Sequence, residues 1–260
     1  MTGGAWAEHV LPHGPLTQLA PRVWQVTGQT PGFGFPRNMT LWRMDDGGLW
    51  VHSAVACDAT TMAEIEALGP PAVLVVPANV HRLDAAVWKA RYPALRVVCP
   101  AGVQEAVARA LPVDSTDADV PGVLTHALPG VRPLENAYQV DAGAGHALVF
   151  CDALFNVRPT RWVLALVLFL IGGRGFGMTR VTRWRLLRSG PAFAAWLRAR
   201  DGADARAPVP LPRGRRPARP RAEAPRSRGE VVGVPGLGAG GGPRNAPRSR
   251  RGKLRYFASR

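Results

Sequence analysis

Short apolar runs alternate with helix-like segments through the middle of the chain, and this alternation constrains the fold more than any other feature. The run "AVLVVP" (72–77) is continuously apolar, as is typical of strands that are covered on both faces, and the largely apolar runs "LRVVCP" (95–100) and "HALVFCD" (146–152) also predict buried strands. Helical spacing is found in "TTMAEIEALG" (60–69), "LDAAVWKARYP" (83–93) and "GVQEAVARAL" (102–111). The spacing predicts an α/β architecture with a partly parallel sheet.

The net charge of +15 is confined to the C-terminal part of the chain. Residues 1–157 carry nine basic and fourteen acidic side chains, whereas residues 158–200 carry nine arginines and no acidic side chain. Residues 201–260 carry fifteen basic side chains against four acidic ones. An acidic body with a basic end excludes a domain that binds nucleic acid through a uniformly basic surface.

The three cysteines, Cys57, Cys99 and Cys151, lie in or near apolar runs and form no Cys-x-x-Cys pair. This pattern indicates reduced, buried cysteines and favours a cytoplasmic protein. The start, "MTGGAWAEHVLPHG", has no basic segment followed by an apolar one, so we predict no secretory signal and expect residues 1–17 to be flexible.

The run "WVLALVLFLI" (162–171) is the most apolar stretch, but it is too short for the ~20 residues that span a bilayer. We therefore predict no transmembrane span. A buried helix is one interpretation, and an interfacial helix held by flanking arginines on anionic lipid is the other. From residue 201 onward Pro, Gly and Arg dominate, which predicts a disordered tail over 201–260. A second hypothesis is that this tail is out-of-frame sequence that replaced the last elements of a domain spanning 18–200.

Polar residues follow the apolar runs at the edge of the predicted sheet where ligands usually bind. The loop "PANVHRLD" (77–84) comes directly after one run, and "LWVHS" (49–53) and "PLENAY" (133–138) supply further polar groups. A lone histidine in such a loop is more often a local hydrogen-bonding residue than a ligand, since catalytic zinc uses three protein ligands. The residues of the candidate pocket are His52, Asn79, His81, Asp84, Glu135 and Asp152.

Ser53 follows His52 directly, but no Gly-x-Ser-x-Gly elbow surrounds it. The sequence therefore disfavours a serine hydrolase. The arginine-rich tail could contact nucleic acid weakly and without sequence preference, because no base-reading motif accompanies it.

The order of these features resembles the metallo-β-lactamase superfamily, and more closely an uncharacterised branch of it, a domain of unknown function. The resemblance covers roughly residues 18–190 and is carried by "NMTLWRMDDGGLWVHS", "AVLVVPANVHRLDAAVW", "YPALRVVCP", "CDALFN" and "WVLALVLFLIGGRGFGMTRVTRW". It implies a four-layer αββα sandwich whose C-terminal part is incomplete. In the family's His-x-His-x-Asp-His register, Asn79, His81, Leu83 and Asp84 stand at the four ligand positions, so three of the four have changed. Asp152 stands where the family places its metal-bridging aspartate.

The resemblance thus implies a hydrolase-like scaffold with an impaired or lost metal site that binds an unknown small polar ligand. No cofactor is expected. Zinc or another divalent ion, if bound, would be held by His81, Asp84 and Asp152. If the protein is an enzyme, it is expected to be a hydrolase of the metallo-β-lactamase type. The alternative is a non-catalytic protein that associates with a membrane surface or nucleic acid through residues 162–171 and the tail.

Overall fold

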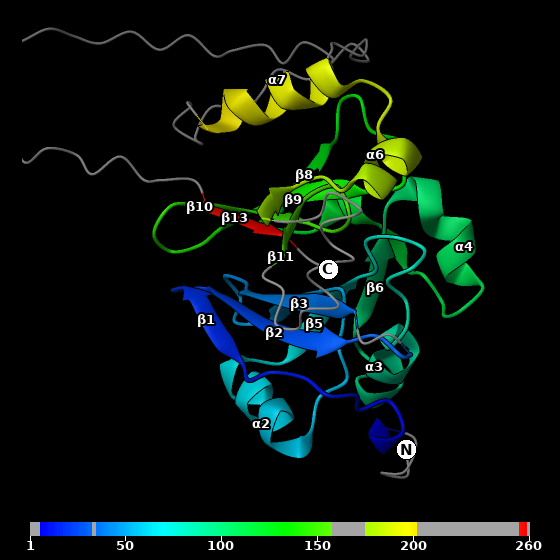
Figure 1. Ribbon diagram of the computed structural model, residues 1–260. Helices are drawn as coiled ribbons and strands as arrows, with labels where there is room; N and C mark the ends of the chain where they lie inside the picture. Colours follow the sequence, from blue (N-terminus) through cyan, green and yellow to red (C-terminus); the bar gives the residue numbers. More distant parts are fainter. Residues whose placement is uncertain (1–5, 33–34, 158–174, 202–254, 259–260) are drawn as a thin grey trace, which may run out of the picture. The chain divides into compact units, whose positions relative to one another are not determined.

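Two β-sheets form the centre of the fold in the computed structural model, which describes residues 6–32, 35–157, 175–201 and 255–258 (Figure 1). The predicted apolar helix at 162–171 and residues 202–254 and 259–260 of the predicted tail lie outside the described residues. Within the described part of the chain, every helix is too short or too polar to cross a bilayer.

The first sheet has seven strands that follow one another in space as they do in sequence. They are β1 (Thr17–Ala20), β2 (Val23–Gln29), β3 (Pro36–Arg43), β4 (Leu49–His52), β5 (Pro71–Val75), β6 (Arg96–Cys99) and β7 (Ser115–Thr116). Strands β1 to β4 pair antiparallel, and β4 to β7 pair parallel. Parallel neighbours need a crossover, which α2 (Ala59–Leu68) and α3 (Ala85–Arg91) provide. The prediction of a partly parallel sheet is therefore confirmed.

Helix α2 begins and ends at specific residues. The Asp58 side chain caps its first turn by accepting a hydrogen bond from the Thr61 backbone N–H at 2.8 Å. Gly69 follows the last turn with φ +152°, and a side-chain Cβ at that position would lie 2.1 Å from the carbonyl oxygen of Gly47. Glycine is therefore required where the chain leaves α2 and enters β5.

The second sheet has four strands in the order β13, β10, β9, β8. Their bounds are β8 (Leu124–Ala127), β9 (Asn136–Asp141), β10 (His146–Phe150) and β13 (Arg255–Ala258). Strands β8, β9 and β10 pair antiparallel, and β13 pairs parallel with β10. The remaining elements are a two-stranded ribbon of β11 (Phe155–Val157) and β12 (Gly175–Gly177), the short helices η1 (Ala101–Val103), α4 (Gln104–Ala108) and η2 (Asp117–Asp119), and the helices α6 (Arg180–Leu186) and α7 (Gly190–Asp201).

Three clusters of buried side chains separate four layers. The first cluster packs one face of the seven-stranded sheet, including Leu41, against Trp88 of α3 and the buried side of α2. The second packs the opposite face, including Trp50, against Tyr138 of the four-stranded sheet. The third packs Phe150 of the four-stranded sheet against α6 and α7. Successive residues of a strand point to opposite faces, so each sheet serves two of the three clusters. The order helix, sheet, sheet, helix confirms the αββα sandwich.

Two boundary predictions differ from the structure. Residues 1–17 are predicted to be flexible; in the described part of this segment, the Trp6 ring lies 5.9 Å from that of Trp88, and its indole N–H donates to the Cys57 carbonyl oxygen. The Trp6 indole thus packs its apolar ring against another ring and finds an acceptor for its N–H group, and these two contacts hold this part of the N-terminal segment in place. In the predicted tail, Asp201 closes α7 and Arg255–Ala258 forms β13.

Candidate functional site

The candidate site lies where the carboxyl ends of three strands meet. Ser53 follows β4, the loop 76–84 follows its parallel neighbour β5, and Asp152 follows β10 of the other sheet. Parallel neighbours direct their carboxyl ends to the same edge, which is why the segments after β4 and β5 come together. His81 joins the three segments through its two ring nitrogens.

His81 lies between a hydroxyl and a carboxylate. Its Nδ1 is 2.9 Å from Ser53 Oγ, and its Nε2 is 3.2 Å from Asp152 Oδ1. The His81 side chain is largely buried, whereas that of Asp152 is partly exposed. Both imidazole nitrogens therefore already have a partner. The structure brings His81 and Asp152 together.

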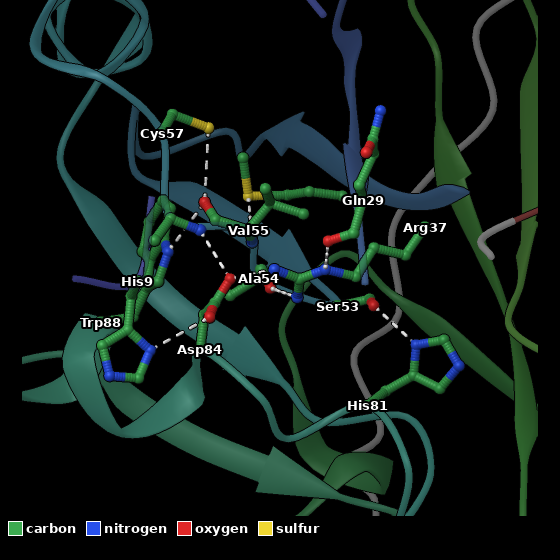
Figure 2. Close-up of polar contacts among 12 residues, drawn as sticks. His9, Gln29, Arg37, Ser53, Ala54, Val55, Cys57, His81, Asp84 and Trp88 are labelled. Atoms are coloured by element: carbon green, nitrogen blue, oxygen red, sulfur yellow. Dashed lines mark hydrogen bonds and ion pairs between the residues drawn. The ribbon is translucent and has the colours of Figure 1, made fainter. Parts of the chain in front are cut away.

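Asp84 has a different environment. It is buried and forms an ion pair with Arg37, accepts a hydrogen bond from the Ala56 backbone N–H at 2.8 Å, and lies 3.4 Å from His9 Nδ1. Figure 2 shows the Asp84 carboxylate directed toward the segment after β4, while His81 turns to Ser53. The predicted grouping of Asp84 with His81 and Asp152 is therefore wrong.

The physical reason is local. Asp84 stands at the N-cap position of α3, on the side of the sheet that the helices cover, whereas His81 comes three residues earlier, before the turn. There Arg37 supplies the charge that a buried carboxylate needs. Arg37 also donates to the carbonyl oxygens of Gln29 and Ala54, so this network fixes the segment after β4.

Two cavities border the site. One, of about 310 Å³, is lined by Asn79, Glu135, Asp152 and Arg185 together with apolar side chains of α4 and α6. We call it the Asn79 cavity. The amide oxygen of Asn79 is buried and has no hydrogen-bond partner among the described residues. A buried acceptor without a partner is costly, so this oxygen suits a ligand or a water molecule that donates to it.

The second cavity, of about 350 Å³, is the His81 cavity. His81 and Asp152 line it, and Arg37 lies at its wall. Its other lining side chains are mainly apolar: Phe35, Pro36, Val80, Leu83 and Val181, with Thr30, Thr179 and Thr182. Asp152 also lines the Asn79 cavity, so the two cavities adjoin at this carboxylate.

Glu135 supports the segment that carries Asp152. Its buried carboxylate accepts hydrogen bonds from the backbone N–H groups of Cys151, Asp152 and Ala153 at 2.8, 2.9 and 3.1 Å. Burial raises the pKa of Glu135 to about 8, and the nearby Asp152 charge adds to this, while the three N–H donors act in the opposite direction. Glu135 therefore belongs to the site as a support.

His52 is fully buried between the two sheets. Its ring stacks on Trp50 at 5.5 Å and meets the edge of Tyr138 at 5.4 Å. Neither ring nitrogen has a hydrogen-bond partner among the described residues. Burial, with a smaller contribution from nearby His81, lowers the pKa of His52 to about 3, so the ring is neutral at physiological pH. The structure places His52 beside the pocket, within the inter-sheet core.

One group of potential metal ligands is present in the described part of the chain. Ligand atoms of His81, Cys151 and Asp152 all lie within 4.8 Å of one another. Burial and the adjacent carboxylates raise the pKa of the Cys151 thiol well above its usual value. Zinc would have to deprotonate this thiol and displace at least one partner of the imidazole. The residues do not fit a catalytic zinc site with three ready ligands and an open position.

Three participants were missed by the sequence reasoning: Ser53 as the partner of His81, Arg37 as the partner of Asp84, and Cys151 beside Asp152. The signal available for Ser53 was its position directly after the "LWVH" run; its φ of +59°, unusual for a residue other than glycine, is seen only in the structure. Cys57, Cys99 and Cys151 are buried free thiols, as predicted.

No protein-family model matches the sequence, and no curated protein matches it. Several solved structures of metallo-β-lactamases match part of the chain. DIM-1 exposed to ceftazidime is 11% identical with a TM-score of 0.45, over 58% of this chain and 74% of that one. FIM-1 from Pseudomonas aeruginosa, in its mono-zinc form, is 12% identical with the same TM-score and coverage. The enzyme from Hirschia baltica is 15% identical with a TM-score of 0.43, over 57% and 76% of the two chains. The chemistry of the site is argued from its own residues alone.

Proposed function

We propose that the protein is a hydrolase-like protein with an impaired metal site, and that its cavities bind a small polar ligand. The observation that carries this proposal is the divergence of His81 and Asp84. One makes hydrogen bonds at the cavity, and the other neutralises Arg37 in the core. Of the three residues that could have formed a metal site, His81 and Asp152 therefore lie close together, whereas Asp84 has a structural role.

The chemistry of the remaining donors supports the same proposal. His81 has a partner at each nitrogen, and the Cys151 thiol is held in its protonated form. Asn79, at the first position of the family's motif, offers only a neutral amide oxygen, which binds zinc poorly. Asn79 lines the Asn79 cavity, and a ligand whose N–H or O–H group reached this buried oxygen would satisfy it.

Elemental analysis tests the metal part of the proposal. Full-length protein purified without a histidine tag is expected to contain zinc, iron and manganese far below one ion per chain. The H81A variant serves as the matched control, since metal at the site depends on His81 and adventitious surface metal does not. One bound ion per chain that disappears in H81A would contradict the proposal.

Thermal unfolding tests the ligand part. Short amides and alcohols, screened at millimolar concentration, are expected to include compounds that raise the melting temperature of the wild type and not of N79L. The control is Leu124→Ala, at an exposed position outside both cavities. Equal shifts in N79L and the wild type would argue against binding at Asn79.

A specific observation favours a second candidate function, association with anionic membranes. Trp184 of α6 is 86% exposed and Val181 is 55% exposed. Arginines surround them at 180, 183, 185 and 188, and the segment 180–188 has no acidic residue. Exposed tryptophan among arginines is typical of a segment that lies at a membrane surface.

Vesicle co-sedimentation tests this candidate. Vesicles that contain phosphatidylglycerol are expected to bind the full-length protein, and pure phosphatidylcholine vesicles are not. The W184A variant should bind more weakly, whereas L124A, at an exposed position on β8, should bind normally. Undiminished vesicle binding by W184A would count against a membrane role. So would binding of the protein to double-stranded DNA at a salt concentration that releases it from the vesicles.

A further inference from the structure

Ser53, His81 and Asp152 form a continuous chain of hydrogen bonds. The Ser53 hydroxyl lies 2.9 Å from His81 Nδ1, and His81 Nε2 lies 3.2 Å from Asp152 Oδ1. The three residues come from different strand ends, after β4, after β5 and after β10. The arrangement is therefore a product of the fold, which joins positions 28 and 71 residues apart.

The proton positions along this chain follow from the chemistry of the groups. A carboxylate only accepts hydrogen bonds, so His81 must donate its Nε2–H to Asp152. In a neutral imidazole the other nitrogen is then an acceptor, and Ser53 must donate its hydroxyl proton to Nδ1. The serine hydroxyl thus points its proton at a base whose orientation a carboxylate fixes.

The backbone of Ser53 is an independent sign of a special role. Its φ of +59° is the only positive value for a non-glycine residue in the described part of the chain. The residue stands between the end of β4 and the segment that leads to α2, at a sharp turn after a strand. Strained serines at such turns present nucleophiles in other folds, where flanking glycines make the turn. Here the neighbours are His52 and Ala54, which is why the sequence pattern disfavoured a serine hydrolase.

We propose that Ser53 is a nucleophile for acyl transfer, with His81 as its general base and Asp152 as the residue that positions His81. This inference deepens the proposed function and rests on it, because it assigns the hydrolase chemistry of the same site to side chains in place of a metal. The substrate class is a small carboxylic ester.

The reaction balances with water as the second substrate. Ser53 Oγ bonds to the ester carbonyl carbon as its proton passes to His81 Nδ1. The bond from that carbon to the alcohol oxygen breaks, and the leaving oxygen takes the proton from His81. Water then gives a proton to His81 as its oxygen bonds to the acyl carbon. The acyl-serine bond breaks, Ser53 Oγ recovers the proton, and a carboxylic acid leaves.

The surroundings limit the substrate to a short acyl group. Ser53 is only 1% exposed, so a bulky acyl group cannot reach its hydroxyl. Ser53 itself lines neither cavity, so an ester must reach its hydroxyl past His81, which does line the His81 cavity. The wall of that cavity includes the apolar side chains of Phe35, Val80 and Val181. Arg37 at the same wall supplies a positive charge, although it is also paired with Asp84. Acetyl and similarly small esters match these constraints.

Acetylation by p-nitrophenyl acetate tests the proposal directly. The full-length protein is incubated with the ester and EDTA, quenched in acid, and digested, and acetyl groups are located by mass spectrometry. We expect acetyl on Ser53 in the wild type, none in S53G, and a rate on the order of 100-fold lower in H81A. S115A is the control, since Ser115 lies in β7 outside the site.

Asp152 needs a separate readout because it acts through His81. D152N is expected to lower kcat for the ester by about 100-fold with little change in KM, since the substrate still binds but the imidazole loses its orientation. Circular dichroism establishes that each variant is folded, and S53G in particular relieves the backbone strain.

The outcomes separate this inference from the proposed function. Acetyl groups found only at other residues, or a Ser53 acetylation rate unchanged in H81A, would overturn the assignment of Ser53 as the nucleophile. Neither result would contradict the proposal of an impaired metal site. Stoichiometric zinc together with ester hydrolysis that EDTA abolishes would overturn both.

Discussion

The two faces of the seven-stranded sheet differ at the edge where β4 and β5 end. On the helix-covered face, Asp84 is paired with Arg37 and accepts a further backbone hydrogen bond. On the face toward the second sheet, His52 has no hydrogen-bond partner among the described residues, and Ser53 beside it has a strained backbone. The comparison shows that the short segment 52–56 contributes to stability on the helix-covered face. On the other face the same segment carries two features that lower the free energy of unfolding, the unpartnered His52 ring and the strained Ser53 backbone.

The largest expected effect tests the helix-covered face. Removing one partner of a buried ion pair leaves the other charge without compensation, so D84A should lower the free energy of unfolding by about 3–5 kcal/mol. Urea denaturation measures this. The matched control is D45A, because Asp45 pairs with Arg22 at 2.6 Å but is 83% exposed, and its loss should cost less than about 1 kcal/mol. Similar losses in the two variants would remove the contrast between the faces.

The next effect tests the cost of His52 through pH. Its pKa is about 3 in the folded protein and near 6.5 in the unfolded chain, so only the unfolded state takes up a proton as the pH falls between these values. Stability should therefore be lost through this window, by about 2 kcal/mol between pH 7 and pH 5. H52F, which keeps an aromatic ring against Trp50, should lose less stability over the same range.

The control for this experiment is Leu124→Ala at an exposed position of β8, which removes no titratable group and should leave the pH dependence unchanged. An H52F variant whose stability falls with pH as steeply as that of the wild type would show that another group is responsible.

A smaller effect tests the strain at Ser53. Both S53A and S53G remove the hydroxyl, but only glycine adopts a φ of +59° without steric cost. S53G should therefore be more stable than S53A by about 1–2 kcal/mol. The same pair of substitutions at Ser115, in strand β7, should give the opposite order, because glycine weakens a strand. Thermal unfolding of the four variants measures both differences. If S53A were as stable as S53G or more stable, the turn at Ser53 would not be strained.

The smallest effect concerns divalent metal. Since the groups on the inter-sheet side do not form a ready set of ligands, EDTA followed by gel filtration should leave the melting temperature of the wild type unchanged. Adding zinc back in slight excess should raise it no more than it raises that of H81A. A zinc-dependent increase specific to the wild type would mean that His81 exchanges its hydrogen bonds for a metal.

The sequence was sufficient for the architecture and for part of the site. Continuous apolar runs and helical spacing are local signals, and they predicted the parallel strands and α2 and α3 correctly. The pairing of Asp84 with Arg37 joins residues 47 apart, and no local pattern indicates it. The register of the family's motif put Asp84 beside His81, yet the start of α3 turned it to the other face. Ser53 was visible as a residue, but its backbone angle depends on the sheet around it.

Strand β13 pairs with β10 and covers the hydrogen-bonding edge that β10 would otherwise present to solvent. Loss of β13 would therefore leave β10 open to pairing with an exposed strand of another molecule, so this short strand protects the sandwich against edge-to-edge aggregation.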